Sequence, residues 1–157
     1  MPIHQLKIFL DRYGVKYTVI SHSTAYTAQE VAQSTHTPGR ELAKTVMIKV
    51  NGEMAMAVLP ASYQVELDLL KGAIGAREVG LATEEEFRSR FPDCELGAMP
   101  PFGNLYGMEV FVDKMLTEDK EIAFNAGNHR ELIRMEYRDF EWLVHPKIMS
   151  FCAMYAL

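Results

Sequence analysis

Long apolar runs are missing from this chain of 157 residues. None of its hydrophobic segments approaches the roughly 18 consecutive apolar residues that a membrane-spanning helix needs. The first five residues, MPIHQ, also lack the basic and apolar regions of a secretory signal peptide. Composition does not shift along the chain, and no Ser-rich linker divides it. The sequence therefore predicts one domain over residues 1–157 that lies in the cytoplasm and contacts no membrane.

Cysteine is scarce, and the histidines show no spacing typical of metal ligands. Cys94 and Cys152 are far apart and belong to no CxxC pair, which indicates reduced thiols. The five histidines form no HxH or HxxxH pattern. We therefore expect no disulfide, no metal site and no cofactor.

An excess of positive charge is also absent. The chain has 16 Lys and Arg against 21 Asp and Glu, which gives a formal net charge of −5. Binding along a nucleic-acid backbone needs clustered lysine and arginine, so this balance argues against DNA and against a wide footprint on RNA. A nucleic-acid partner would be held only locally.

What the chain does contain is a mixture of helical and strand patterns. The helices that we predict cover residues 3–13, 28–34, 63–71, 83–90 and 139–144. Capping boxes begin the second and fourth of these at Thr27 and Thr83, Gly72 ends the third, and Asp139 caps the last. The predicted strands cover residues 17–20, 43–50, 53–60, 108–112 and 121–126.

Residues 132–137 alternate like a further strand, although a helix over 129–137 capped by Asn128 also fits. Strands and short helices interleave, and several connections are typical of hairpins rather than helical crossovers. This pattern favours an α+β fold with a mixed, largely antiparallel sheet over a doubly wound parallel sheet.

Lys44 is the most informative residue, because it lies on the apolar face of a predicted strand. It shares that face with Val46, Ile48 and Val50, while Lys49 points the other way as an ordinary solvated lysine. The Asn51-Gly52 pair after the strand predicts a two-residue hairpin turn, whose register places Lys44 opposite Leu59. An amine in such a place either has its pKa lowered or meets an anion, and both arrangements recur at functional sites. Alternatively, Lys44 lies at the strand's frayed end and extends its ammonium into water.

A second candidate is the segment from Gly97 to Gly103, with the sequence GAMPPFG. Its two prolines stiffen the backbone, and its terminal glycines permit conformations that other residues avoid. The amides of Gly97, Ala98 and Met99 can converge on one oxygen, which is how acyl-transfer sites stabilise an oxyanion. The alternative is a Pro-rich connection without a catalytic role.

A third candidate is the segment NAGNH, residues 125–129. A glycine turn after a strand would hold the His129 imidazole at the strand end, within reach of a substrate hydroxyl or phosphate. The alternative is an exposed turn histidine. No GxSxG motif accompanies it, and neither cysteine has an evident activating neighbour.

Together these segments resemble the YbaK and prolyl-tRNA-synthetase-associated editing family. The resemblance rests on HSTAYTAQEVA at 22–32, LAKT at 42–45, the GxxxP loop at 97–101 and NAGNH at 125–129. It implies an α+β fold with a barrel-like mixed sheet flanked by helices. It also implies a free-standing aminoacyl-tRNA deacylase that acts in trans on mischarged tRNA.

The resemblance further implies roles for individual residues. Lys44 would be the essential lysine, holding the terminal phosphate or ribose, and the loop amides of Gly97, Ala98 and Met99 would bind the carbonyl oxygen. Water would attack with help from a ribose hydroxyl of the substrate. The remaining residues would line the substrate site: Tyr26, Thr27, Pro101, Phe102, Gly103, Asn125, Gly127 and His129.

The expected partner is the aminoacylated CCA end of a tRNA, with a synthetase or elongation factor supplying further tRNA affinity. Two other functions fit the same residues. One is a module that binds a nucleotide or an RNA 3′ end without cleaving it, and the other is a hydrolase of small acyl esters or amides unrelated to tRNA. The identity of the amino acid that is removed is left open by the sequence.

Overall fold

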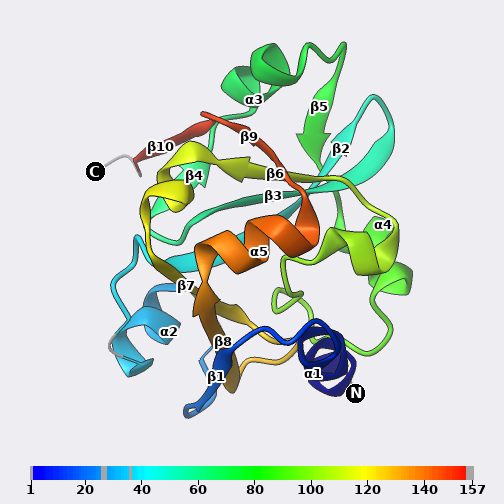
Figure 1. The fold of residues 1–157 in the computed structure, drawn as a ribbon. Coiled ribbons are helices and arrows are strands. Elements are labelled where there is room, and N and C mark those ends of the chain that lie inside the picture. Colours follow the sequence, from blue (N-terminus) through cyan, green and yellow to red (C-terminus); the bar gives the residue numbers. More distant parts are fainter. Residues whose placement is uncertain (1, 26–27, 36, 155–157) are drawn as a thin grey trace.

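The computed structural model describes residues 2–25, 28–35 and 37–154, which form a mixed sheet with helices packed on it (Figure 1). The order of the paired strands is β1 (Tyr17–Ser21), β8 (Glu131–Glu136), β7 (Glu121–Asn125), β2 (Leu42–Val50), β3 (Glu53–Pro60), β6 (Val110–Asp113) and β9 (Lys147–Met149). A further strand, β5 (Val79–Leu81), pairs with β2. Separately, β4 (Tyr63–Val65) pairs with β10 (Cys152–Met154).

The helices are α1 (Pro2–Arg12), α2 (Ala28–Thr35), α3 (Leu67–Ile74), α4 (Glu84–Phe87) and α5 (Tyr137–Val144). Short 3₁₀ turns cover Arg88–Arg90, Gly103–Tyr106 and Lys114–Glu118. None of the helices in the described part of the chain is long and apolar enough to cross a bilayer.

The sheet confirms the predicted fold class, because parallel and antiparallel pairs occur together. β2–β7, β3–β6 and β6–β9 are parallel. The other four pairs are antiparallel: β1–β8, β7–β8, β2–β3 and β2–β5. The sheet is not a closed barrel, since the strand path ends at β1 on one edge and at β9 on the other.

The β2–β3 hairpin has the predicted register. Lys44 lies opposite Leu59, and Val50 lies opposite Glu53. Asn51 and Gly52 both have positive φ, at 51° and 84°. A two-residue primed turn requires this conformation, so the local Asn-Gly signal set the register of the longest pairing in the sheet.

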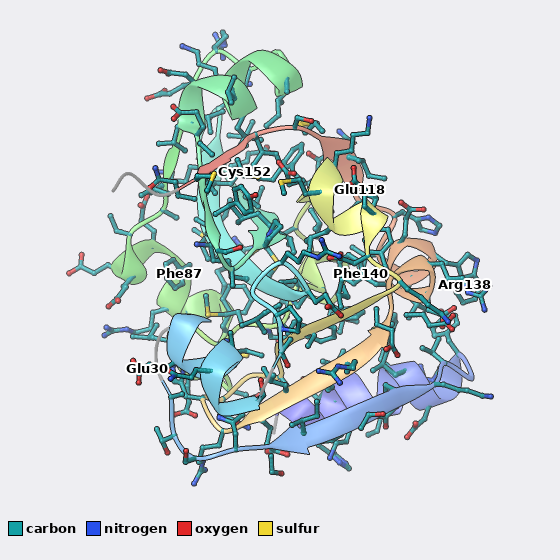
Figure 2. All side chains as sticks on the ribbon, turned by 90° about the vertical axis from the view of Figure 1, so that its left-hand side faces the viewer. Glu30, Phe87, Glu118, Arg138, Phe140 and Cys152 are labelled. Atoms are coloured by element: carbon teal, nitrogen blue, oxygen red, sulfur yellow. The ribbon has the colours of Figure 1, made fainter. Side chains whose placement is uncertain are left out.

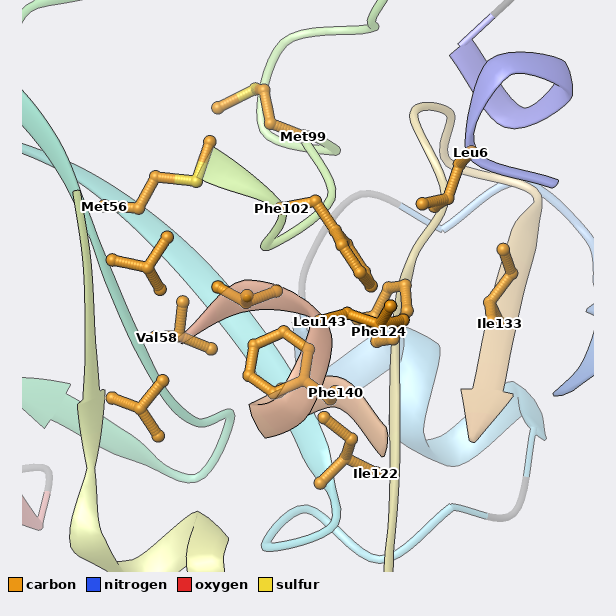
Figure 3. Close-up of a cluster of buried hydrophobic side chains, with 14 of the residues drawn as sticks. Leu6, Met56, Val58, Met99, Phe102, Ile122, Phe124, Ile133, Phe140 and Leu143 are labelled. Atoms are coloured by element: carbon orange, nitrogen blue, oxygen red, sulfur yellow. The ribbon is translucent and has the colours of Figure 1, made fainter. Parts of the chain in front are cut away.

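Alternate residues of the hairpin enter different hydrophobic cores, one on each face of the sheet. On one face, Met47, Met56 and Val58 pack with residues of α1, α4 and α5. Phe102 lies in that core, with ring centroids 5.4 Å from Phe124 and 5.5 Å from Phe140 (Figure 3).

The opposite face carries Ile48, Ala57 and Leu59, which pack against Leu70 of α3 and against Phe151. A third cluster joins Val31 of α2 to Leu42 and Ala123. The sheet is therefore covered on both faces, and Lys44 emerges on the face of Leu59.

The predicted helix over residues 63–71 is partly wrong. Residues 63–65 form β4, and the helix runs from Leu67 to Ile74. Its left-handed cap is Gly75, with φ 76°, rather than Gly72. The cause is tertiary, because β4 pairs with β10 at the other end of the chain, with Tyr63 opposite Met154.

The strand interpretation of residues 132–137 is confirmed for 132–136 by β8, whereas Tyr137 is helical. The prediction that Asp139 caps the last helix is wrong, since α5 begins at Tyr137 directly after β8. The Tyr137 amide donates to the Lys120 carbonyl oxygen at 2.9 Å. A backbone acceptor therefore satisfies one of the first amides of the helix, and no side-chain cap is needed there.

The capping box at Thr83 is confirmed, with Thr83 and Glu86 each accepting the other's amide. The Glu86 carboxylate also pairs with Lys49, and this bond lowers the pKa of Glu86 to about 2. Lys49 is thus a paired surface lysine on the face opposite Lys44. The other predicted capping box begins at Thr27, which lies outside the described residues.

Candidate active site

The loop that begins at Glu95 is built on a tight turn. The Ala98 amide donates to the Glu95 carbonyl oxygen at 3.1 Å, which closes a four-residue turn with Gly97 in its third position. Gly97 has φ +83° there. Type II turns require a positive φ at this position, so glycine is the residue that adopts it without strain.

This turn is bonded to the tip of the β7–β8 hairpin. The Glu95 amide donates to the Gly127 carbonyl oxygen, and the Gly127 amide donates to the Ala98 carbonyl oxygen, both at 2.8 Å. Two segments about thirty residues apart therefore act as one rigid unit. Gly97, Ala98 and Gly127, which the sequence suggested separately, lie together.

His129 is buried in the same unit, with 5% of its surface exposed. Its Nε2 donates to the Leu96 carbonyl oxygen at 2.6 Å, and its backbone amide donates to Glu95 Oε1 at 2.9 Å. Its carbonyl oxygen accepts the amide of Ala25 at 3.1 Å. His129 thus joins the loop to the segment after β1. Tyr26 and Thr27 follow Ala25 but lie outside the described residues.

Lys44 lies near the tip of the β7–β8 hairpin because its own strand, β2, pairs with β7. The parallel register pairs Ala43 with Phe124, so Lys44 and Asn125 are the next residues along the two strands. The Asn125 side chain is half-buried, and its Oδ1 has no hydrogen-bond partner among the described residues. The structure therefore brings two predicted polar site residues to one position at the end of β7.

The charge of Lys44 also acts on Cys152 of β10, which is labelled in Figure 2. Burial and the hydrogen-bonded Asp113 carboxylate raise the pKa of the Cys152 thiol to about 12, while the positive charge of Lys44 acts in the opposite direction. Lys44 is half-buried. Its side chain leaves β2 on the face that carries Ile48 and Leu59.

The structure does not bring every predicted residue to this position. Met99 and Phe102 belong to the core on the other face of the sheet, and Phe102 is fully buried. Pro101 and Gly103 are also buried. A Cβ atom on Gly103 would lie 2.8 Å from the Met108 carbonyl oxygen, so close packing requires glycine there. These buried residues hold the loop in place by packing in the interior of the protein.

Lys44 and the loop therefore reach the hairpin tip from different sides. Lys44 lies on the Leu59 face beside Asn125, and the loop binds the tip at Gly127 and His129. Residues 125–129 connect the two groups.

The loop amides differ in whether they already donate a hydrogen bond to the backbone. Ala98 already donates within the turn, whereas Gly97 and Met99 have no backbone acceptor in the described part of the chain. Fixed amides of this kind can stabilise negative charge that develops on a carbonyl oxygen.

A hollow of about 500 Å³ lies elsewhere. It is lined by the connection between α1 and β1 and by residues of β1, β8 and α5, including Tyr13, Arg138 and Trp142. Arg138 lies on the opposite side of the view in Figure 2 from Glu30 of α2. The hollow contains none of the predicted site residues. Within residues 2–25, 28–35 and 37–154, no group of three or more His, Cys, Asp or Glu is placed to hold a metal ion.

Two residues of this region had no role in the sequence interpretation. The Glu95 carboxylate accepts the amide of His129, 34 positions away, and Cys152, near the other end of the chain, lies in the field of the Lys44 charge. Both interactions join segments that are far apart in the sequence, so a local sequence pattern does not reveal them. The one local signal for Glu95 is its place two positions before Gly97, the glycine of the tight turn.

Comparisons with known proteins agree on one family. The aminoacyl-tRNA editing domain matches residues 22–143. The multifunctional Ser/Thr-tRNA deacylase ProXp-y of Escherichia coli K12 is 29% identical over 154 residues, covering 94% of this chain and 92% of that protein. The prolyl-tRNA editing protein ProX of Acetoanaerobium sticklandii is 23% identical over 151 residues, covering 92% of each.

Solved structures share the fold. A crystal structure described as a candidate trans-editing enzyme for prolyl-tRNA synthetase superposes with a TM-score of 0.83 at 18% identity, and the match covers 97% of both chains.

Proposed function

This chain belongs to the aminoacyl-tRNA editing domain family, and we propose that it acts in trans to remove wrongly attached amino acids from tRNA. The bond that breaks is the ester between the amino acid and the 3′-terminal adenosine. Water supplies the oxygen, and the products are the free amino acid and the tRNA with its terminal hydroxyl restored. Serine and threonine are the first substrates to try, because a relative named as a Ser/Thr-tRNA deacylase covers nearly the whole chain.

The observation that carries this proposal is the union of the loop with the β7–β8 tip beside Lys44. Two backbone hydrogen bonds of 2.8 Å hold Glu95–Ala98 against Gly127, and the strand register brings Lys44 to Asn125. A cation and a set of fixed amides thus border the segment 125–129 from two sides. Negative charge on a phosphate and on a reacting carbonyl is what such groups stabilise.

In this mechanism Lys44 binds the phosphate or ribose of the terminal nucleotide. The amides of Gly97 and Met99 bind the carbonyl oxygen as it becomes anionic, and Ala98 joins them if its bond to Glu95 opens. A ribose hydroxyl of the substrate orients the attacking water. Because an aminoacyl ester is already activated, positioning the ester and one water supplies much of the required lowering of the barrier.

Recognition of the tRNA is local. The chain is acidic, with a formal net charge of −5, so it holds the CCA end without tracking the whole acceptor arm. A synthetase or an elongation factor would supply the remaining affinity for tRNA. The residues around Tyr26, Thr27, Asn125 and His129 would surround the amino acid.

The decisive experiment compares two lysines of one strand. Lys44→Ala is expected to lower deacylation of seryl-, threonyl-, alanyl-, prolyl- or cysteinyl-tRNA by about 10²–10³-fold, as for loss of one electrostatic contact to the transition state. Lys49→Ala is the matched control, because Lys49 faces the other side and pairs with Glu86. Equal rates for the two folded variants would rule out the proposed role of Lys44.

A further inference from the structure

We propose that Glu95 is a positioning residue that locks the catalytic loop onto the β7–β8 hairpin tip. The inference rests on the proposed deacylase function and adds a residue that lies outside the GxxxP motif. In this proposal the Glu95 carboxylate fixes the direction in which the amides of the loop point.

Glu95 makes three hydrogen bonds, one from each of its polar groups. Its amide donates to the Gly127 carbonyl oxygen at 2.8 Å, and its carbonyl oxygen accepts the Ala98 amide at 3.1 Å. Its carboxylate Oε1 accepts the His129 amide at 2.9 Å. A single residue therefore closes the turn around Gly97 and ties that turn to both Gly127 and His129.

The carboxylate contact is reciprocal. Glu95 holds the main chain of His129, and the His129 ring holds the carbonyl oxygen of Leu96 at 2.6 Å. The side chain of each residue thus fixes the backbone at or next to the other. A Cβ atom at Gly97 would lie 3.6 Å from His129 Cε1, so the imidazole also contacts the turn directly.

Loss of the carboxylate would leave the His129 amide without its acceptor. His129 is buried, and a buried amide without an acceptor is destabilising. The hairpin tip would relieve this cost by moving toward water, and the loop bonded to it would move as well. A shift of about 1 Å in a catalytic group is enough to lower a rate by about 10²-fold.

The task needs an oxygen acceptor and does not need a negative charge. Glutamine keeps an oxygen at the same position, whereas alanine removes it. This difference separates a positioning role from direct electrostatic contact with the substrate, such as binding of its α-ammonium group.

The test measures deacylation of mischarged tRNA by Glu95→Ala and Glu95→Gln, together with amide hydrogen exchange at Ala98, Gly127 and His129. We expect Glu95→Ala to lower kcat by about 10- to 100-fold with KM little changed, and to speed exchange at His129 and Gly127. Glu95→Gln should keep kcat within about threefold of the unmodified chain and keep the slow exchange.

Two results would overturn the proposal. Equal loss of kcat in both variants would show that the negative charge of Glu95 is what activity requires. Full activity of Glu95→Ala together with fast amide exchange would show that the loop does not need the hydrogen bond from His129 to Glu95. If the unmodified chain hydrolyses none of the aminoacyl-tRNAs, the proposed function fails. The exchange rates would still decide whether Glu95 holds the loop.

Discussion

Substitution of Gly97 by alanine isolates the contribution of the loop conformation. Gly97 has φ +83°, and Gly52 in the β2–β3 turn has φ +84°. An added Cβ at Gly97 meets the His129 ring at ordinary distances, 3.6 Å from Cε1 and 4.0 Å from Nε2, and one at Gly52 meets nothing within 4 Å. The two positions therefore differ little in steric room and share the same backbone strain.

That strain is about 1–2 kcal/mol for an L-residue in the left-handed region. For a chain of this size each kilocalorie lowers Tm by roughly 2–4 °C, so both variants should melt roughly 2–8 °C lower. Their activities should differ. The loop in Gly97→Ala relieves its strain by moving the amides of Gly97 and Met99, and deacylation should fall by about 10²-fold.

The assay measures kcat on mischarged tRNA at a temperature where both variants are fully folded by circular dichroism. Gly52→Ala should keep the kcat of the unmodified chain. Our reasoning about the loop is refuted if Gly97→Ala keeps full activity despite a lower Tm. It is refuted equally if the two variants lose the same activity.

Two further predictions concern buried carboxylates. Asp113 accepts the amides of Met115, Phe151 and Cys152 at 2.9, 2.8 and 3.0 Å, and Asp113→Asn leaves one acceptor oxygen for three donors. We expect a loss of about 1–3 kcal/mol, seen as a lower urea midpoint with an unchanged m-value, and an unchanged midpoint would contradict this account. At Asp119, burial raises the pKa from 3.8 to about 6. The folded state then holds a proton that the unfolded state has released, so stability should fall as pH rises from about 4 to about 6, and Asp119→Asn should remove this slope.

The predictions that succeeded rest on signals within a few residues. Asn51-Gly52 fixed the hairpin and hence the register of Lys44, because the turn type admits a single pairing. The Thr83 capping box likewise needs only residues three positions apart. Gly97 has the positive φ that the terminal glycine of the loop was expected to permit, and the catalytic role of the loop stays a prediction.

The predictions that failed depend on contacts between distant segments. β4 and β10 have three residues each and exist because they pair across the whole chain, which no local pattern encodes. The spacing of the apolar residues in the segment 63–71 fits a helix. Residues 63–65 nevertheless form a strand, because they pair with β10. Glu95 escaped notice for the same reason, since its acceptor role depends on the position of His129.

The two lysines of β2, Lys44 and Lys49, differ in the side chains on which their positive charges act. Lys49 pairs with Glu86, a carboxylate whose pKa is held at about 2, so its charge is neutralised over the working range of pH. The positive charge of Lys44 acts on the Cys152 thiol, and Asp113 accepts the Cys152 amide at 3.0 Å. With a pKa raised to about 12, this thiol stays protonated at neutral pH. Cys152 is therefore an uncharged group in the field of Lys44, and the thiol itself does not offset the positive charge of that lysine.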